Sequence, residues 1–153
     1  MSPYTFTKRV GHDFAFNPSR TYTQDQDCKP TGFWVSVDGD WERWLSDEGL
    51  DGDEWGVRTV TIDLDADACL WITSVEELDD FHDNYATPHA GVFCGRPDYY
   101  RIDWEPLTAQ WSGIVIAPYL WERRLGPGAS RWYYPWDAAS GCIWDLSAIR
   151  GAA

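Results

Sequence analysis

Three side chains of this sequence have the types and settings that a reactive site needs. His12 follows a β-prone run and Gly11, a residue that lets another group approach the backbone closely. Ser36 lies inside a second β-prone run, and Asp137 lies in an aromatic segment near the C-terminus. An imidazole transfers protons near neutral pH, and a fixed carboxylate stabilises a positive charge that develops during a reaction. We therefore take His12, Ser36 and Asp137 as the candidate reactive groups.

The chain contains 11 tryptophans, more than core packing alone requires in 153 residues. One group, Trp34, Trp41 and Trp44, surrounds the first acidic turn. A second aromatic group, beside Asp137 and Ser140, consists of Trp132, Tyr133, Tyr134, Trp136 and Trp144. A concave site with flat aromatic walls and a carboxylate at one end suits a planar or sugar-bearing ligand.

Several familiar site patterns are missing from the sequence. Neither Ser36 nor Ser140 lies in the G-x-S-x-G turn of a nucleophilic serine, and no glycine-rich phosphate loop is found. His82, His89 and Cys94 match no common metal-ligand spacing, so we expect no metal. The four cysteines lie far apart and form no C-x-x-C pair, which favours reduced thiols.

Short elements must position these groups. Period-two patterns and short apolar runs predict seven strands, at residues 4–10, 31–37, 59–64, 69–73, 99–102, 113–117 and 141–146. Helices are predicted where Asp40 and Asp103 cap short segments, and after the capping box that begins at Ser74. The helices are too few for regular βαβ alternation. We therefore expect one compact α+β domain, residues 1–153, with a mostly antiparallel sheet and about three short helices.

Charge is divided unevenly along the chain. The net charge is −13, from 25 acidic and 12 basic residues. Residues 1–83 hold 19 acidic and 6 basic residues, whereas residues 84–153 hold 6 of each, so the first half carries the whole excess. Such a surface repels a phosphate backbone and argues against a nucleic-acid partner. No signal peptide or membrane span is visible, and we expect a cytoplasmic protein without membrane contact.

Several segments follow one another in an informative order. They are His12 after the first strand, the run Lys29-Pro30-Thr31-Gly32-Phe33-Trp34-Val35-Ser36, a short helix, and the late run Trp136-Asp137-Ala138-Ala139-Ser140-Gly141-Cys142-Ile143-Trp144. This order resembles that of small ADP-ribosyltransferase-like domains. The resemblance implies a split α+β sheet that holds NAD in a cleft. It also implies cleavage of the nicotinamide–ribose bond and transfer of ADP-ribose to an acceptor that the sequence does not identify.

In that family an early His or Arg hydrogen-bonds the adenosine ribose, an aromatic wall sandwiches the nicotinamide, and a late Glu, Gln or Asp stabilises the ribosyl cation. The resemblance therefore assigns NAD-binding roles to eight residues. They are His12 at the ribose, Gly32, Phe33 and Trp34 at the pocket edge, Ser36 as polar support, and Trp136, Asp137 and Ser140 in the late segment. The usual Q-x-E or E-x-E pair is absent, and Asp103 and Glu105 are rivals of Asp137 for the acid.

Two other functions fit the same sequence. A noncatalytic interaction or inhibitor protein would bind a basic partner through the acidic residues 1–83. A carbohydrate-binding module would stack sugar rings on the tryptophans, although the expected helices and unpaired cysteines are unusual for one. Binding of NAD would favour the transferase hypothesis, whereas binding of a basic protein or of an oligosaccharide would favour one of these two alternatives.

Overall fold

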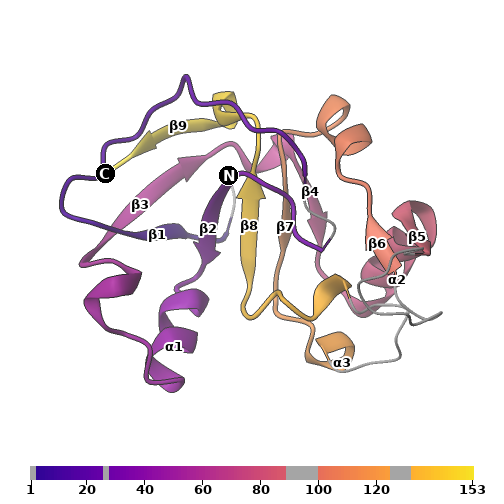
Figure 1. Cartoon of the computed structure of the whole chain (residues 1–153), viewed down its shortest axis with the longest axis horizontal. Coiled ribbons are helices and arrows are strands. Elements are labelled where there is room, and N and C mark those ends of the chain that lie inside the picture. Colours follow the sequence, from indigo (N-terminus) through magenta and orange to yellow (C-terminus); the bar gives the residue numbers. More distant parts are fainter. Residues whose placement is uncertain (1–2, 26–27, 89–99, 125–131) are drawn as a thin grey trace.

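A seven-stranded sheet forms the centre of the molecule (Figure 1). The computed structural model describes residues 3–25, 28–88, 100–124 and 132–153. The strand order is β4-β7-β8-β2-β1-β3-β9, in which only β4 and β7 pair in parallel. The strands are β1 (Phe6–Val10), β2 (Phe33–Val37), β3 (Arg58–Leu64), β4 (Cys69–Ile72), β7 (Gly113–Ile116), β8 (Ser140–Ile143) and β9 (Ile149–Ala152). A separate two-stranded sheet pairs β5 (Ala86–Pro88) with β6 (Tyr100–Ile102). The expected α+β class with a mostly antiparallel sheet is confirmed.

Helices are few and short in the described residues. They are α1 (Asp40–Asp47), α2 (Val75–Tyr85) and α3 (Trp121–Arg124), with 3-10 turns η1 (Asp53–Trp55), η2 (Ala66–Ala68), η3 (Glu105–Ala109) and η5 (Leu146–Ala148). The predicted cap of α2 is confirmed, because Ser74 Oγ accepts a hydrogen bond of 3.1 Å from the Glu77 backbone N–H. Glu77 reaches one residue further back than expected and accepts from the Thr73 N–H at 2.9 Å.

The predicted cap of α1 is wrong. Gly39, with a φ of 72°, occupies the N-cap position and provides no side-chain cap. Asp40 is instead the first helical residue, and its carboxylate accepts a hydrogen bond of 2.7 Å from the Ala139 backbone N–H. A long-range acceptor role has replaced the local capping role, and it ties the start of α1 to the segment before β8.

Two more elements differ from expectation in the second half. The helix predicted after Asp103 is the 3-10 turn Glu105–Ala109, which follows Trp104 as its N-cap. The strand predicted at 141–146 ends at Ile143, and the chain continues through a turn to β9. The edge strand β9 is not predicted by the sequence, because its four residues include Gly151 and show no alternating pattern. His89, Cys94 and the first residue of the strand predicted at 99–102 lie outside the described residues.

The sheet buries apolar side chains on both faces. Within β7, Val115 packs into one core cluster, while Ile114 and Ile116 pack into the other, as the period-two geometry of a strand requires. Helix α2 adds Leu78 and Phe81 to the second cluster. Two cores therefore hold the sheet rigid from both sides.

Pairing between β1 and β2 stops early, although each strand stays paired to its other neighbour. The two strands are in register only at Phe6–Val37 and Thr7–Ser36. Beyond these pairs β1 continues along β3 and β2 continues along β8, and in Figure 1 the two strands run apart. The pairing between β1 and β2 thus covers only two residue pairs at one end of the strands.

Candidate functional site

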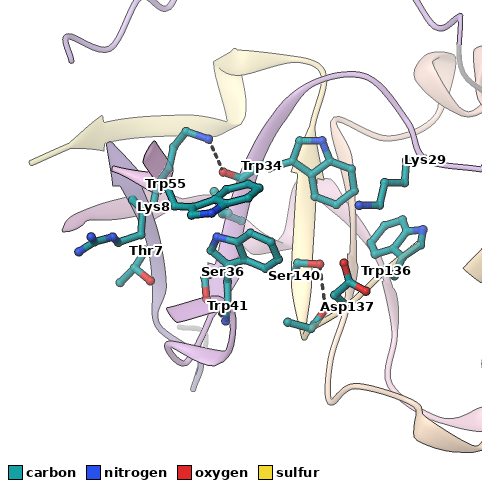
Figure 2. A pocket seen from close by; sticks show the side chains of 13 residues that line it. Thr7, Lys8, Lys29, Trp34, Ser36, Trp41, Trp55, Trp136, Asp137 and Ser140 are labelled. Carbon is teal, nitrogen blue, oxygen red and sulfur yellow. Dashed lines mark hydrogen bonds between the residues drawn. The ribbon is translucent and has the colours of Figure 1, made fainter. Parts of the chain in front are cut away.

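A pocket of about 300 Å³ lies at the opening between β1 and β2 (Figure 2). Strand β1 contributes Thr7, Lys8 and Arg9, strand β2 contributes Trp34, Val35 and Ser36, and Lys29 precedes β2; Trp41 comes from α1, Trp55 from η1, and Trp136, Asp137, Ala138 and Ser140 from the segment that enters β8. This volume is at the lower end of the ~300–1,000 Å³ found for small-molecule sites.

Four tryptophans from distant parts of the chain form the walls. The rings of Trp41 and Trp55 meet edge to face with centroids 6.1 Å apart, and those of Trp34 and Trp136 do so at 4.9 Å. Trp136 is buried, whereas Trp55 is 42% exposed. Members of both sequence groups therefore meet at this pocket, Trp34 and Trp41 from the first and Trp136 from the second, whereas Trp44, Trp132 and Trp144 do not line it. The lining of the pocket is thus rich in aromatic rings.

The start of α1 fixes the position of Trp41. The Trp41 backbone N–H donates a hydrogen bond of 3.0 Å to Ser36 Oγ, and the buried Ser36 hydroxyl thereby satisfies a free N–H in the first turn of the helix. Trp41 also stacks on Trp44, with centroids 4.9 Å apart and ring planes 13° from parallel. Ser36 thus serves as a positioning group for the aromatic wall.

Asp137 provides the carboxylate of the pocket. Its Oδ1 lies 3.5 Å from a guanidinium nitrogen of Arg124, and its side chain is 25% exposed. The Arg124 guanidinium lies over the Tyr134 ring at 5.4 Å, which holds the cation beside the carboxylate. Ser140 lies on the same wall, where its hydroxyl donates to the Ala138 backbone oxygen at 3.0 Å.

Both lysines of the chain, Lys8 and Lys29, line this pocket. Burial lowers the pKa of each ammonium below its ordinary value, and for Lys29 the neighbouring Asp137 carboxylate opposes that shift. Arg9 adds a third cation, and its guanidinium donates to the Gly56 backbone oxygen at 2.5 Å. No carboxylate in the described part of the chain forms an ion pair with Lys8, Arg9 or Lys29. A protein with a net charge of −13 therefore carries a local cationic site.

The pocket gathers five of the eight residues that the resemblance singles out. These are Trp34, Ser36, Trp136, Asp137 and Ser140. The other three are His12, Gly32 and Phe33, and none of them lines it. Neither of the rival acids, Asp103 and Glu105, lines it.

Each of the three residues outside the pocket has a structural setting of its own. His12 is exposed in the turn after β1. Phe33 faces the core on the other side of β2, with its ring against those of Phe14 and Phe16. A Cβ on Gly32 would lie 2.6 Å from the Ile143 backbone oxygen, so close packing against β8 requires glycine there.

Sequence reasoning missed the cations of the pocket. Arg9 lies three residues before His12 and is the early basic residue that the structure brings into the pocket. Lys8 and Lys29 carried a usable signal, because a chain with ten arginines and only two lysines places both lysines next to β-prone runs. The sequence around Trp55 gave no signal of a site role, because Trp55 lies in a short acidic segment with no regular pattern.

Comparisons with protein-family models, with curated proteins and with solved structures each found no match. In residues 3–25, 28–88, 100–124 and 132–153, no three His, Cys, Asp or Glu side chains come together as a metal site would require. No helix in those same ranges is long and apolar enough to cross a membrane.

Proposed function

We propose that the pocket between β1 and β2 binds NAD and that the protein transfers ADP-ribose from it. The observation that carries this proposal is the composition of the pocket: four tryptophans, one carboxylate, and three cations that form no ion pair with another described residue. Planar bases stack on aromatic rings, phosphates attract cations, and a carboxylate favours a ribosyl cation. NAD combines all three of these ligand features.

The volume of the pocket sets how NAD would lie. About 300 Å³ accommodates one nucleoside half, so the other half extends along the surface. We place the nicotinamide riboside half inside, because Asp137 and the buried Trp136 lie there and exclude water from one side of the ribose. Thr7, Lys8 and Arg9 at the β1 side then face the phosphates.

The reaction follows from the charge that develops at the ribose. As the bond from C1′ to the nicotinamide nitrogen breaks, its electron pair neutralises the pyridinium ring and C1′ becomes cationic. Asp137 stabilises that cation more strongly than it stabilises bound NAD, which lowers the barrier. Arg124, 3.5 Å from Asp137 Oδ1, holds the carboxylate in place and partly offsets its charge.

The test combines binding and turnover. Calorimetry with NAD, nicotinamide riboside, a neutral oligosaccharide and a basic protein should give heat with NAD, less heat with the riboside because it lacks phosphates, and none with the oligosaccharide. Incubation with NAD should release nicotinamide. Absence of both NAD binding and nicotinamide release would overturn the proposal, and binding of the oligosaccharide alone would assign the aromatic walls to a carbohydrate.

A second candidate function rests on a different surface. From the last residue of α1 through η1, five carboxylates are exposed, those of Asp47, Glu48, Asp51, Asp53 and Glu54. A basic partner protein would be attracted to this segment by charge complementarity. Binding of that kind disappears at moderate salt and survives Lys8→Met, whereas NAD binding is weakened by that substitution.

A further inference from the structure

The two lysines of the pocket differ in how their ammonium groups are engaged. Lys8 Nζ donates a hydrogen bond of 2.9 Å to the Trp34 backbone oxygen and lies 4.5 Å from the centre of the Phe33 ring. Lys29 Nζ lies 5.3 Å from the centre of the Trp34 ring, and the described residues give it no hydrogen-bond acceptor. Lys8 is therefore held by the protein, while the amine of Lys29 is available to a bound molecule.

The backbone on both sides of Lys29 is anchored to the pocket wall. Trp136 Nε1 donates to the Cys28 backbone oxygen at 3.3 Å, and the buried Cys142 thiol donates to the Pro30 backbone oxygen at 3.6 Å. These contacts fix the Cα of Lys29 next to Trp136. In Figure 2 the Lys29 side chain extends between Trp34 and Trp136 toward the side where Asp137 lies.

We infer that the amine of Lys29 is itself an acceptor of ADP-ribose, so that the protein modifies itself in this pocket. The inference rests on the proposed function, because it requires NAD to be bound with its C1′ beside Asp137. The neutral amine attacks C1′ through its lone pair and forms a C–N bond, while the bond from C1′ to nicotinamide breaks and its electrons leave with the neutral nicotinamide. The resulting secondary ammonium then loses one proton to the carboxylate or to water.

The surroundings favour the reactive form of this amine. Burial lowers the pKa of Lys29, so a larger share of it is neutral than for an exposed lysine, and only the neutral form has a lone pair to donate. A partly buried amine that lies beside the site of bond cleavage also reacts at high effective concentration.

The experiment uses the whole chain and NAD labelled in its adenosine half. We expect one ADP-ribosyl group per protein on Lys29, located by fragmentation mass spectrometry, with one nicotinamide released for each group added. Lys29→Arg should keep the positive charge and lose the label. Lys8→Arg is the matched control, and in it the label should remain on Lys29 whatever happens to the total rate.

Free ADP-ribose is the second control, because its aldehyde attaches to lysines without an enzyme. Label on Lys29 from NAD but not from free ADP-ribose supports the inference. Equal labelling by the two reagents overturns it. Nicotinamide release without label on Lys29 also overturns it and leaves the proposed transferase intact. If NAD is neither bound nor cleaved, the proposed function falls and this inference falls with it.

Discussion

The ammonium of Lys8 hydrogen-bonds the backbone oxygen of Trp34 at 2.9 Å, at a place where β1 would otherwise pair with β2. The register Thr7–Ser36 puts Arg9 opposite Trp34 two residues further on, where the Arg9 N–H would reach the same oxygen. A side chain from β1 thus takes the place of a backbone bond. The Lys8 side chain thereby gives the Trp34 backbone oxygen a hydrogen-bond donor although the two strands are not paired here. The pocket lies between the two strands at this position.

Replacing Lys8 by Met removes that hydrogen bond and leaves the Trp34 oxygen without its partner. A hydrogen bond from a charged group contributes about 1.5–3 kcal/mol, so the free energy of unfolding should fall by about 1–3 kcal/mol. NAD affinity should fall about tenfold or more, because one cation of the pocket is lost together with the hydrogen bond that links β1 to β2 at the pocket. Chemical denaturation and calorimetry measure the two effects. Lys8→Arg should retain most of both, and an unchanged affinity in Lys8→Met would contradict this role.

Replacing Trp55 by Ala tests the aromatic wall. Stacking of a base on an aromatic ring contributes about 1–3 kcal/mol, so the dissociation constant for NAD should rise about 5- to 150-fold. Because Trp55 is 42% exposed, the change should hardly affect folding. Trp121→Ala is the matched control, since Trp121 is 66% exposed and does not line the pocket. Equal losses in the two variants would rule out a specific stacking role.

Replacing Asp137 by Asn separates catalysis from binding. Loss of one electrostatic contact to a transition state costs on the order of 10²-fold in rate, whereas the neutral amide keeps nearly the same shape. Nicotinamide release should fall by about that factor, while the affinity for NAD changes little. Single-turnover assays measure the rate of nicotinamide release, and calorimetry measures the affinity for NAD. A fall in affinity with an unchanged bound-state rate would instead make Asp137 a binding residue.

His82 should make stability depend on pH. The buried Trp132 donates from Nε1 to His82 Nδ1 at 3.0 Å, which requires a neutral imidazole. Burial lowers the pKa of His82, and the facing carboxylates of Asp83 and Asp79 oppose that shift only in part. The unfolded chain therefore binds more protons than the folded one between the two pKa values. The stabilisation is complete above the ordinary histidine pKa of about 6.5 and is lost as the pH falls from there toward the lower folded value.

The measurement is urea denaturation of the wild type and of His82→Gln between about pH 7.5 and pH 5, the range in which a histidine titrates. The wild type should lose stability on acidification, and the variant should lose less because Gln carries no titrating proton. Parallel curves for the two proteins would show that other groups cause the dependence. Arg123, which pairs with Asp79 at 2.7 Å, stays charged throughout and contributes no slope.

Features that depend on neighbouring residues could be predicted from the sequence. The capping box at Ser74 begins a helix as expected, and the alternation in residues 59–64 lies within strand β3. Both signals act within a few residues, through one hydrogen bond or through one face of a strand. Asp40 shows the limit of such reasoning, because its carboxylate bonds to Ala139, which is 99 residues away.

The order of residues was enough to predict the α+β class, the main strands, the acidic first half and two groups of tryptophans near polar residues. It did not show that Trp41, Trp55 and Trp136 share one pocket with both lysines, or that His12 lies outside that pocket. Strand periodicity fixes which way each side chain points, but the place where β1 leaves β2 depends on a contact between Lys8 and Trp34, 26 residues apart, that no local pattern encodes.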